Sequence, residues 1–301
     1  MLEVSNLSKA YGKNKALKDM TFKVKAGEIV ALIGKNGAGK STLLKSIAGD
    51  IVPDQGEIKY KGIDLLKDNY LLNEFGILIQ ASFFDYLNAF DNLVLLMKAS
   101  GYTNLKEIKN KVSEVLDLVG LSEKKYSYVK SFSFGMKQRL GLAQSLLHDP
   151  HFLILDEPFV GLDPIGKEIL KKVIINKARK DKAGIIFSSH DLYDVNEICD
   201  RVVMIEKGEK VFDDVFVFNT IYNIQFKEEL SEQDKEELIK FFGNNIKVNK
   251  NAIEFTDKTI LNEVLSFINN NNIAIDDIKT RENTLYDFFK CEVQIYGNTN
   301  N

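Results

Sequence analysis

The stretch from Gly34 to Thr42, GKNGAGKST, combines a flexible backbone with lysine and hydroxyl side chains. Its glycines allow the backbone to curl until several N–H groups point into one cavity. Lys40 could neutralise phosphate charge there, and the hydroxyl of Ser41 could ligate Mg²⁺. The sequence therefore predicts a phosphate-binding loop made of Gly34, Lys35, Asn36, Gly37, Ala38, Gly39, Lys40, Ser41 and Thr42.

The residues on either side of this loop match the elements that have to hold it. An apolar run over Ile29–Ile33 precedes the loop, and a helical pattern over Leu43–Ala48 follows it. Strand, glycine-rich loop and helix is the order that such a loop requires, and the positive end of the helix dipole attracts an anion. A glycine turn before an ordinary helix is the alternative, and the flanking segments count against it.

Two adjacent carboxylates follow a second apolar run, Phe152–Leu155. Asp156 and Glu157 are expected at the carboxyl end of a buried strand, which in open α/β sheets faces the ligand crevice. Asp156 could reach Mg²⁺, and Glu157 could orient or deprotonate an attacking water. A solvated turn after a core strand is the alternative, and the loop upstream makes it the weaker one.

The composition limits the class of protein. A chain of 301 residues, 45% apolar and 28% charged, is ordinary for a soluble globular protein of one large domain or two. A formal charge of −3 gives no sign of a nucleic-acid partner. Cys199 and Cys291 are far apart and no CxxC occurs, which argues against a disulfide framework or a zinc site and fits a reducing compartment.

The chain has no apolar signal core at its start. No stretch reaches the ~18 consecutive apolar residues of a transmembrane helix. If the protein works at a membrane, we therefore expect a separate chain to span it.

Strands and helices alternate over the first two thirds of the chain, which predicts an α/β fold with a largely parallel sheet covered on both faces. Leu2–Val4 and Met20–Val24 alternate apolar and polar residues and are expected at a sheet edge. Other expected elements are strands at Ile29–Ile33, Phe75–Ile79, Phe152–Leu155 and Gly184–Ser188, helices at Gly166–Lys180 and Leu192–Cys199, and a closing hairpin of Arg201–Ile205 and Lys210–Asp213.

A helical subdomain is predicted over residues 84–150, with helices at Asp91–Ser100, Leu105–Val119 and Ser133–His148. Ser133 occupies the N-cap position of the third helix. The predicted first domain is 1–214. Residues 215–301 are predicted to form a small α+β domain of the split βαβ type, which ends in a helix at Leu285–Cys291.

The order of the motifs resembles the ATP-binding subunit of ABC transporters over residues 1 to about 213. The motifs are GKNGAGKST, Gln80, the SFGMKQR stretch that starts at Ser133 and looks like the ABC signature, Phe152–Glu157, Gly161–Asp163 and Ser188–Asp191. The resemblance implies a P-loop ATPase that binds ATP and Mg²⁺. It implies as partners a second ABC ATPase subunit, identical or paralogous, and a membrane-spanning permease, with the protein cytoplasmic and peripheral on the inner face of the membrane.

The resemblance also implies roles for single residues. Tyr11 would stack on adenine, Gln80 would touch Mg²⁺ or water, and His190 would contact the γ-phosphate. Ser133 and Gly135 would bind the γ-phosphate held by a second subunit, and Asp163 would signal across the dimer. The metal ligands would be Ser41, Gln80 and Asp156, and the catalytic residues Glu157, His190 and Gln80. His148 and His151 have no such setting and are expected to be structural.

Several positions depart from the commonest ABC signature, LSGGQ. Phe132, Phe134 and Met136 replace its Leu, first Gly and Gln, and such variants resemble the branch of exporters for drugs, peptide antibiotics and bacteriocins. The tail Glu282–Phe289 resembles an ending common in that branch. Phe159 and Val160 also depart from the family pattern, and the sequence gives no reason for it.

The aromatic run Phe83–Phe90 has two interpretations. Aromatic side chains of this kind are more often core, but Asp85 and Asn88 among them suit a groove that receives a short helix of a membrane partner. The sequence thus favours an ATPase subunit that powers export through a separate permease. The alternatives are a soluble ABC ATPase without transport and an ATP-dependent switch. The cargo, the direction of transport and the role of the second domain stay open.

Overall fold

The computed structural model describes residues 1–215 and 220–282, and the chain divides into two compact units, Met1–Phe216 and Val217–Asn301. In the described part, no helix is long and apolar enough to cross a membrane.

The first unit is built on a six-stranded sheet in the order β10-β9-β3-β8-β7-β6. The strands from β9 to β6 are parallel, and β10 pairs with β9 in the antiparallel sense. Every residue of β3, β7 and β8 is buried, as a sheet covered on both faces requires. The predicted α/β class and parallel sheet are confirmed. The strands are β3 (Ile29–Ile33), β6 (Phe75–Leu78), β7 (Phe152–Leu155), β8 (Gly184–Ser189), β9 (Arg201–Glu206) and β10 (Glu209–Asp214).

A second sheet corrects the prediction for the N-terminal strands. They do not extend an edge of the parallel sheet but form a separate antiparallel sheet in the order β2-β1-β4-β5. The reason is their alternation of buried and exposed residues, which suits a sheet buried on one face only. The strands are β1 (Leu2–Tyr11), β2 (Asn14–Val24), β4 (Gln55–Tyr60) and β5 (Ile63–Asp64).

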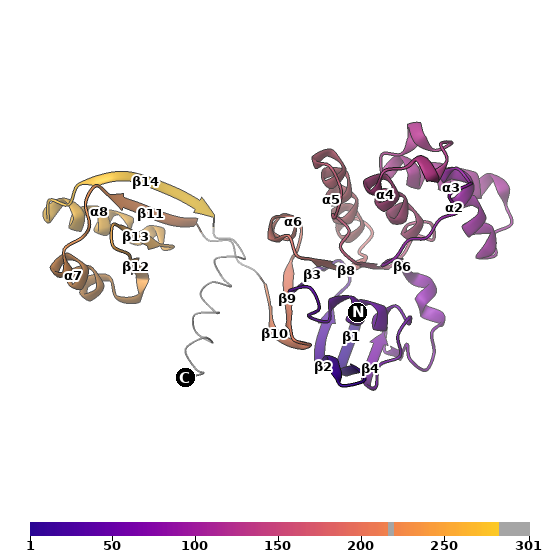
Figure 1. The fold of residues 1–301 in the computed structure, drawn as a ribbon, viewed down its shortest axis with the longest axis horizontal. Helices are drawn as coiled ribbons and strands as arrows, with labels where there is room; N and C mark the ends of the chain where they lie inside the picture. Colours follow the sequence, from indigo (N-terminus) through magenta and orange to yellow (C-terminus); the bar gives the residue numbers. More distant parts are fainter. Residues whose placement is uncertain (216–219, 283–301) are drawn as a thin grey trace. The chain divides into compact units, whose positions relative to one another are not determined.

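The core of this unit lies between the two sheets. Helix α1 (Lys40–Ile47) contributes Leu43, Leu44 and Ile47 to one cluster with Leu2 and Val4 of the antiparallel sheet and with the parallel strands. On the other side of the parallel sheet lie α4 (Phe134–Ser145) and α5 (Pro164–Arg179) (Figure 1). The short helix α6 (Leu192–Asn196) follows β8.

The helical subdomain has the three predicted helices, α2 (Ala89–Ala99), α3 (Leu105–Leu118) and α4 (Phe134–Ser145). Each begins at a side-chain cap, as Asn and Ser favour. The Ser133 hydroxyl accepts a hydrogen bond from the Met136 N–H at 3.2 Å, which confirms the predicted N-cap. Short 3₁₀ turns lie at Tyr70–Glu74, Ser122–Lys124, Val129–Ser131, Gly243–Asn245 and Lys258–Ile260.

The second unit has the element order of a split βαβ fold. Its sheet runs β12-β13-β11-β14 with every pair antiparallel. The elements are β11 (Thr220–Phe226), α7 (Glu232–Phe242), β12 (Ile246–Val248), β13 (Ala252–Phe255), α8 (Leu261–Asn270) and β14 (Ile275–Glu282). The helix predicted at Leu285–Cys291 and nearly all of the tail Glu282–Phe289 lie outside the described residues.

Candidate functional site

The glycine-rich loop connects the end of β3 to the start of α1. Gly37 and Gly39 have φ of +80° and +115°, which L side chains rarely adopt. A Cβ on Gly39 would also lie 2.5 Å from the Ala16 carbonyl oxygen. Gly39 is the N-cap of α1 and offers no side-chain cap, so the first N–H groups of the helix are left for a ligand.

Lys40 is held at the mouth of this loop. Its side chain is only 6% exposed, and its ammonium donates hydrogen bonds to the carbonyl oxygens of Gly34 at 2.6 Å and Lys35 at 3.4 Å. Glu157 Oε1 lies 3.9 Å from the same ammonium. The loop therefore presents a cation toward a carboxylate that comes from a different strand.

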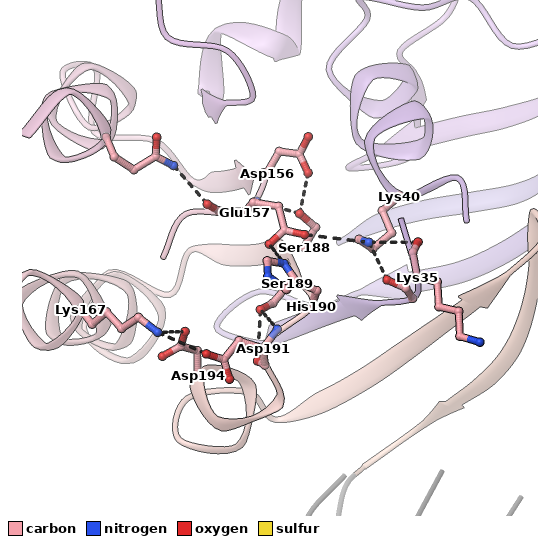
Figure 2. Close-up of polar contacts among 12 residues, drawn as sticks. Lys35, Lys40, Asp156, Glu157, Lys167, Ser188, Ser189, His190, Asp191 and Asp194 are labelled. Atoms are coloured by element: carbon pink, nitrogen blue, oxygen red, sulfur yellow. Dashed lines mark hydrogen bonds and ion pairs between the residues drawn. The ribbon is translucent and has the colours of Figure 1, made fainter. Parts of the chain in front are cut away.

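The two carboxylates lie at the carboxyl edge of the parallel sheet, directly after β7. The Ser188 hydroxyl, on the neighbouring strand β8, donates to Asp156 Oδ1 at 2.5 Å and accepts from the Glu157 N–H at 2.8 Å. Glu157 Oε2 lies 2.9 Å from His190 Nδ1 (Figure 2). Since the ends of β3, β7 and β8 meet at one edge, the fold brings Lys40, Glu157 and His190 together.

Three other predicted residues lie on segments of their own, with the following contacts and exposure. Tyr11 ends β1 and is half exposed, with Lys9 Nζ 5.7 Å from the centre of its ring. Gln80 is exposed and follows β6 at the same edge of the sheet. Asp163 caps α5 by accepting from the Gly166 N–H at 3.1 Å.

The signature-like stretch starts α4, in the helical subdomain. Ser133 is exposed at the N-terminus of that helix. A Cβ on Gly135 would lie 2.8 Å from the Gly161 carbonyl oxygen, so this position requires glycine for packing within the subunit. That requirement holds whether or not Gly135 also contacts a phosphate.

A cleft of about 300 Å³ opens beside Glu157 and His190. Lys167 on α5 and Asp194 on α6 line it, and their charged atoms are 2.7 Å apart (Figure 2). Asp194 is nearly fully buried, and a second lysine of α5, Lys171, lies 3.1 Å from its other oxygen. This network ties the segment after His190 to α5.

The two lysines of the network have raised pKa values. For Lys167 the main cause is the hydrogen bond to Asp194. For Lys171 burial alone would lower the pKa, but hydrogen bonds to Glu197 and Asp194 outweigh it. Both lysines are therefore charged at neutral pH, and Asp194 is flanked by two cations.

The network also gives a reason for the unusual Phe159. Its ring is buried, packs edge-on against Phe187 with 5.8 Å between centroids, and has Lys171 Nζ 6.0 Å from its centre. Lys167, Lys171 and Asp194 were not predicted from the sequence. The i, i+4 spacing of the two lysines on one helix, with acids after His190, is the signal that could have indicated them.

Replacing Asp194 by Asn should reduce the free energy of unfolding by about 2 kcal/mol, because a buried carboxylate between two lysines loses its charge. The loss should be smaller than for a fully broken buried pair, since Lys167 keeps Asp191 and Lys171 keeps Glu197. Urea denaturation measures it. Glu57→Gln, which breaks an exposed pair with Lys59, is the control and should change nothing measurable. Equal stability of the two variants would contradict a structural role for the network.

Comparisons with known proteins agree with this geometry. A family model described as ABC transporter matches residues 17–160. The chain is similar to an uncharacterized ABC transporter ATP-binding protein of Bacillus subtilis, YxlF, with 38% identity over 82% of this chain and 77% of that protein. It is also similar to the bacitracin transport ATP-binding protein BcrA of Bacillus licheniformis, with 36% identity over 78% of this chain and 76% of that protein.

Among solved structures, this chain resembles a dimeric ATP-binding cassette captured after hydrolysis with ADP and phosphate. The TM-score is 0.66 and the identity 24%, over 71% of this chain and 98% of that chain. At this identity the likeness shows the fold, which is that of P-loop ATPase cassettes.

Proposed function

This chain belongs to the ABC transporter family of ATP-binding proteins, and on that premise we propose that it powers the export of an antimicrobial peptide or drug through a separate membrane-spanning subunit. It is an ATPase, and the observation that carries the proposal is the convergence of Lys40, Glu157 and His190. Lys40 begins the helix after β3, while Glu157 and His190 follow β7 and β8, and this combination of groups suits phosphoryl transfer to water.

In the proposed reaction, a water attacks the γ-phosphorus of ATP and the bond to the ADP oxygen breaks. Lys40 and the N–H groups of the loop neutralise the phosphate charge. Glu157 orients the water and takes its proton, and His190, 2.9 Å from Glu157 Oε2, holds that carboxylate and contacts the γ-phosphate. Tyr11, at the tip of the β1–β2 hairpin, stacks on the adenine.

Three residues, one from the loop and two that follow β6 and β7, also fit Mg²⁺. Ser41 offers a hydroxyl, Asp156 a carboxylate and Gln80 an amide oxygen, and such hard oxygen ligands are those that Mg²⁺ takes. The Asp156 carboxylate accepts from Ser188 through one oxygen. Its remaining acceptor capacity is what a metal ligand requires. Bound Mg²⁺ would screen the phosphate charge.

We further propose that the site is completed by a second ABC ATPase subunit, identical or paralogous. Ser133 is exposed at a helix N-terminus, which suits an anion, and it belongs to the helical subdomain and not to the loop that holds Lys40. Ser133 and Gly135 would therefore bind the γ-phosphate of the ATP held by the partner subunit, with Asp163 signalling across the interface. The solved cassette with the same fold is a dimer.

We also propose a separate function for each of the two units. Residues 1–214 form the nucleotide-binding domain, and residues 215–301 form an accessory domain that regulates the ATPase or stabilises the dimer. The relative BcrA is named for bacitracin transport, which supports a peptide antibiotic as the class of cargo. The protein would act in the cytoplasm, peripherally on the inner face of the membrane.

The exposed aromatic pair Phe84 and Tyr86 is the proposed contact with the permease. These side chains are 45% and 69% exposed, and their ring centroids are 5.6 Å apart. They lie in the segment that joins β6 to α2, between the sheet and the helical subdomain. Large exposed aromatic side chains in such a segment suit the reception of a short amphipathic helix.

Purification from membranes tests both proposals. A tagged Glu157→Gln protein is expressed with its chromosomal neighbours, extracted in detergent and pulled down, and a polytopic membrane protein should co-purify in stoichiometric yield. Adding Phe84→Ser and Tyr86→Ser should release it, because the apolar contact is lost, while ATP binding remains. Val52→Ser, which alters an apolar residue 75% exposed in the turn after α1, is the control.

The two negative outcomes have different meanings. Membrane attachment unaffected by the double replacement would rule out the aromatic contact. A soluble, ATP-dependent dimer with nothing bound would instead favour an ABC ATPase without transport or an ATP-dependent switch.

A further inference from the structure

Glu157 adopts a backbone conformation that L-residues rarely take. Its φ is +48°, in the left-handed region that glycine favours. Such a conformation persists only where the surrounding structure fixes it from several sides. The groups that fix the Glu157 backbone are therefore part of what places its carboxylate.

Two side chains hold this backbone, one on each side of its Cα. The Glu157 N–H donates to the Ser188 hydroxyl at 2.8 Å, and the Gln138 side-chain amide donates to the Glu157 carbonyl oxygen at 3.2 Å. The Ser188 hydroxyl gives its own proton to Asp156, so its lone pair is available for the Glu157 N–H. Both polar groups of the Glu157 main chain are thus bound by side chains.

Gln138 reaches Glu157 from outside the sheet. Ser188 belongs to β8, the neighbour of the strand that ends before Glu157, whereas Gln138 belongs to α4, the helix that begins after Ser133. Gln138 is partly buried, and the residue after it, Arg139, donates to the carbonyl oxygens of Val119 and Gly120. These hydrogen bonds hold α4 to the segment after α3 in the helical subdomain. The Gln138 amide, on the same helix, is therefore well placed to bind the Glu157 carbonyl oxygen.

We propose that Gln138 is a positioning residue for the Glu157 carboxylate. In the left-handed conformation this carboxylate lies 2.9 Å from His190 Nδ1 and 3.9 Å from Lys40 Nζ. The Glu157 carbonyl oxygen also accepts from the Val160 N–H at 3.3 Å, within the same turn, so Gln138 is its donor from the helical subdomain. Without the Gln138 amide, rotation toward the ordinary right-handed region would turn the carboxylate away from both groups. Because Gln138 lies on the helix that Ser133 caps, the placement of Glu157 depends on the position of α4. The inference rests on the proposed function, which makes Glu157 the base.

Replacing Gln138 by Met in the full chain tests this role, since Met keeps the length of the side chain and removes the N–H donor. We expect kcat for ATP to fall about tenfold, equivalent to about 1.4 kcal/mol, while KM and the binding of a fluorescent ATP analogue stay within about twofold of wild type. Gln144→Met on the same helix is the matched control. Its side-chain oxygen has no hydrogen-bond partner among the described residues, and kcat should stay at the wild-type value.

A second variant distinguishes positioning from folding. Gln138→His retains an N–H donor at a similar distance from Cα and should recover much of the lost kcat. A wild-type kcat in Gln138→Met overturns the inference, and so does a His variant as slow as the Met variant. A parallel loss of ATP affinity and thermal stability in Gln138→Met would also overturn it, because a purely structural role has that signature. If wild type itself has no ATPase activity, the proposed function fails instead.

Discussion

Glu157→Gln should lower the turnover of ATP by about 10²–10³-fold and leave ATP binding intact, because the amide cannot take a proton from the attacking water. The substitution keeps the shape of the side chain, so the Lys40 and His190 contacts lose charge but not volume. The γ-phosphate should then stay uncleaved. Phosphate release measures turnover, and a fluorescent ATP analogue measures binding.

A glutamate far from the phosphate-binding loop in sequence supplies the control for this variant. Glu123 is exposed in a 3₁₀ turn of the helical subdomain, and Glu123→Gln should turn over ATP at the wild-type rate. If Glu157→Gln kept more than about half of the wild-type turnover, Glu157 would not be the general base, given the size of such contributions in enzymes. The role proposed for Gln138 would then lose its premise as well.

Lys40→Met should weaken ATP binding by about 100-fold or more, because a charge-assisted contact with the phosphates is lost. Lys40 is buried, and its ammonium is directed into the loop by two carbonyl oxygens. The unfolding temperature of wild type should rise with added ATP, and that of the variant should not.

Lys45→Met tests whether any lysine of α1 has this effect. Lys45 lies in the last turn of the same helix, and its replacement should leave the shift with ATP unchanged. A Lys40→Met protein that ATP still stabilises as strongly as wild type would contradict the phosphate-binding role. Glu157→Gln and Lys40→Met together separate ATP binding from ATP hydrolysis. Glu157→Gln should keep the rise in unfolding temperature with ATP, and Lys40→Met should lose it.

The local parts of the site could be predicted from the sequence. The phosphate-binding loop lies between a strand and a helix that are its immediate neighbours in the chain, so its geometry follows from glycines, a lysine and a helix start. Ser133 as the cap of α4 is equally local. The position of Glu157 after β7 followed from the apolar run before it, because a continuous apolar strand has to be buried.

Only the tertiary structure decided which of these parts meet. The contact of Glu157 with His190 joins residues that follow β7 and β8, and it exists because those strands are neighbours in parallel register. The Lys167–Asp194 pair and the Gln138 hydrogen bond likewise join elements that are separate in sequence. The separate antiparallel sheet was missed for the same reason. Which strand pairs with which depends on hydrogen bonds between distant segments and on the faces left to be covered, and no local pattern of residues encodes that choice.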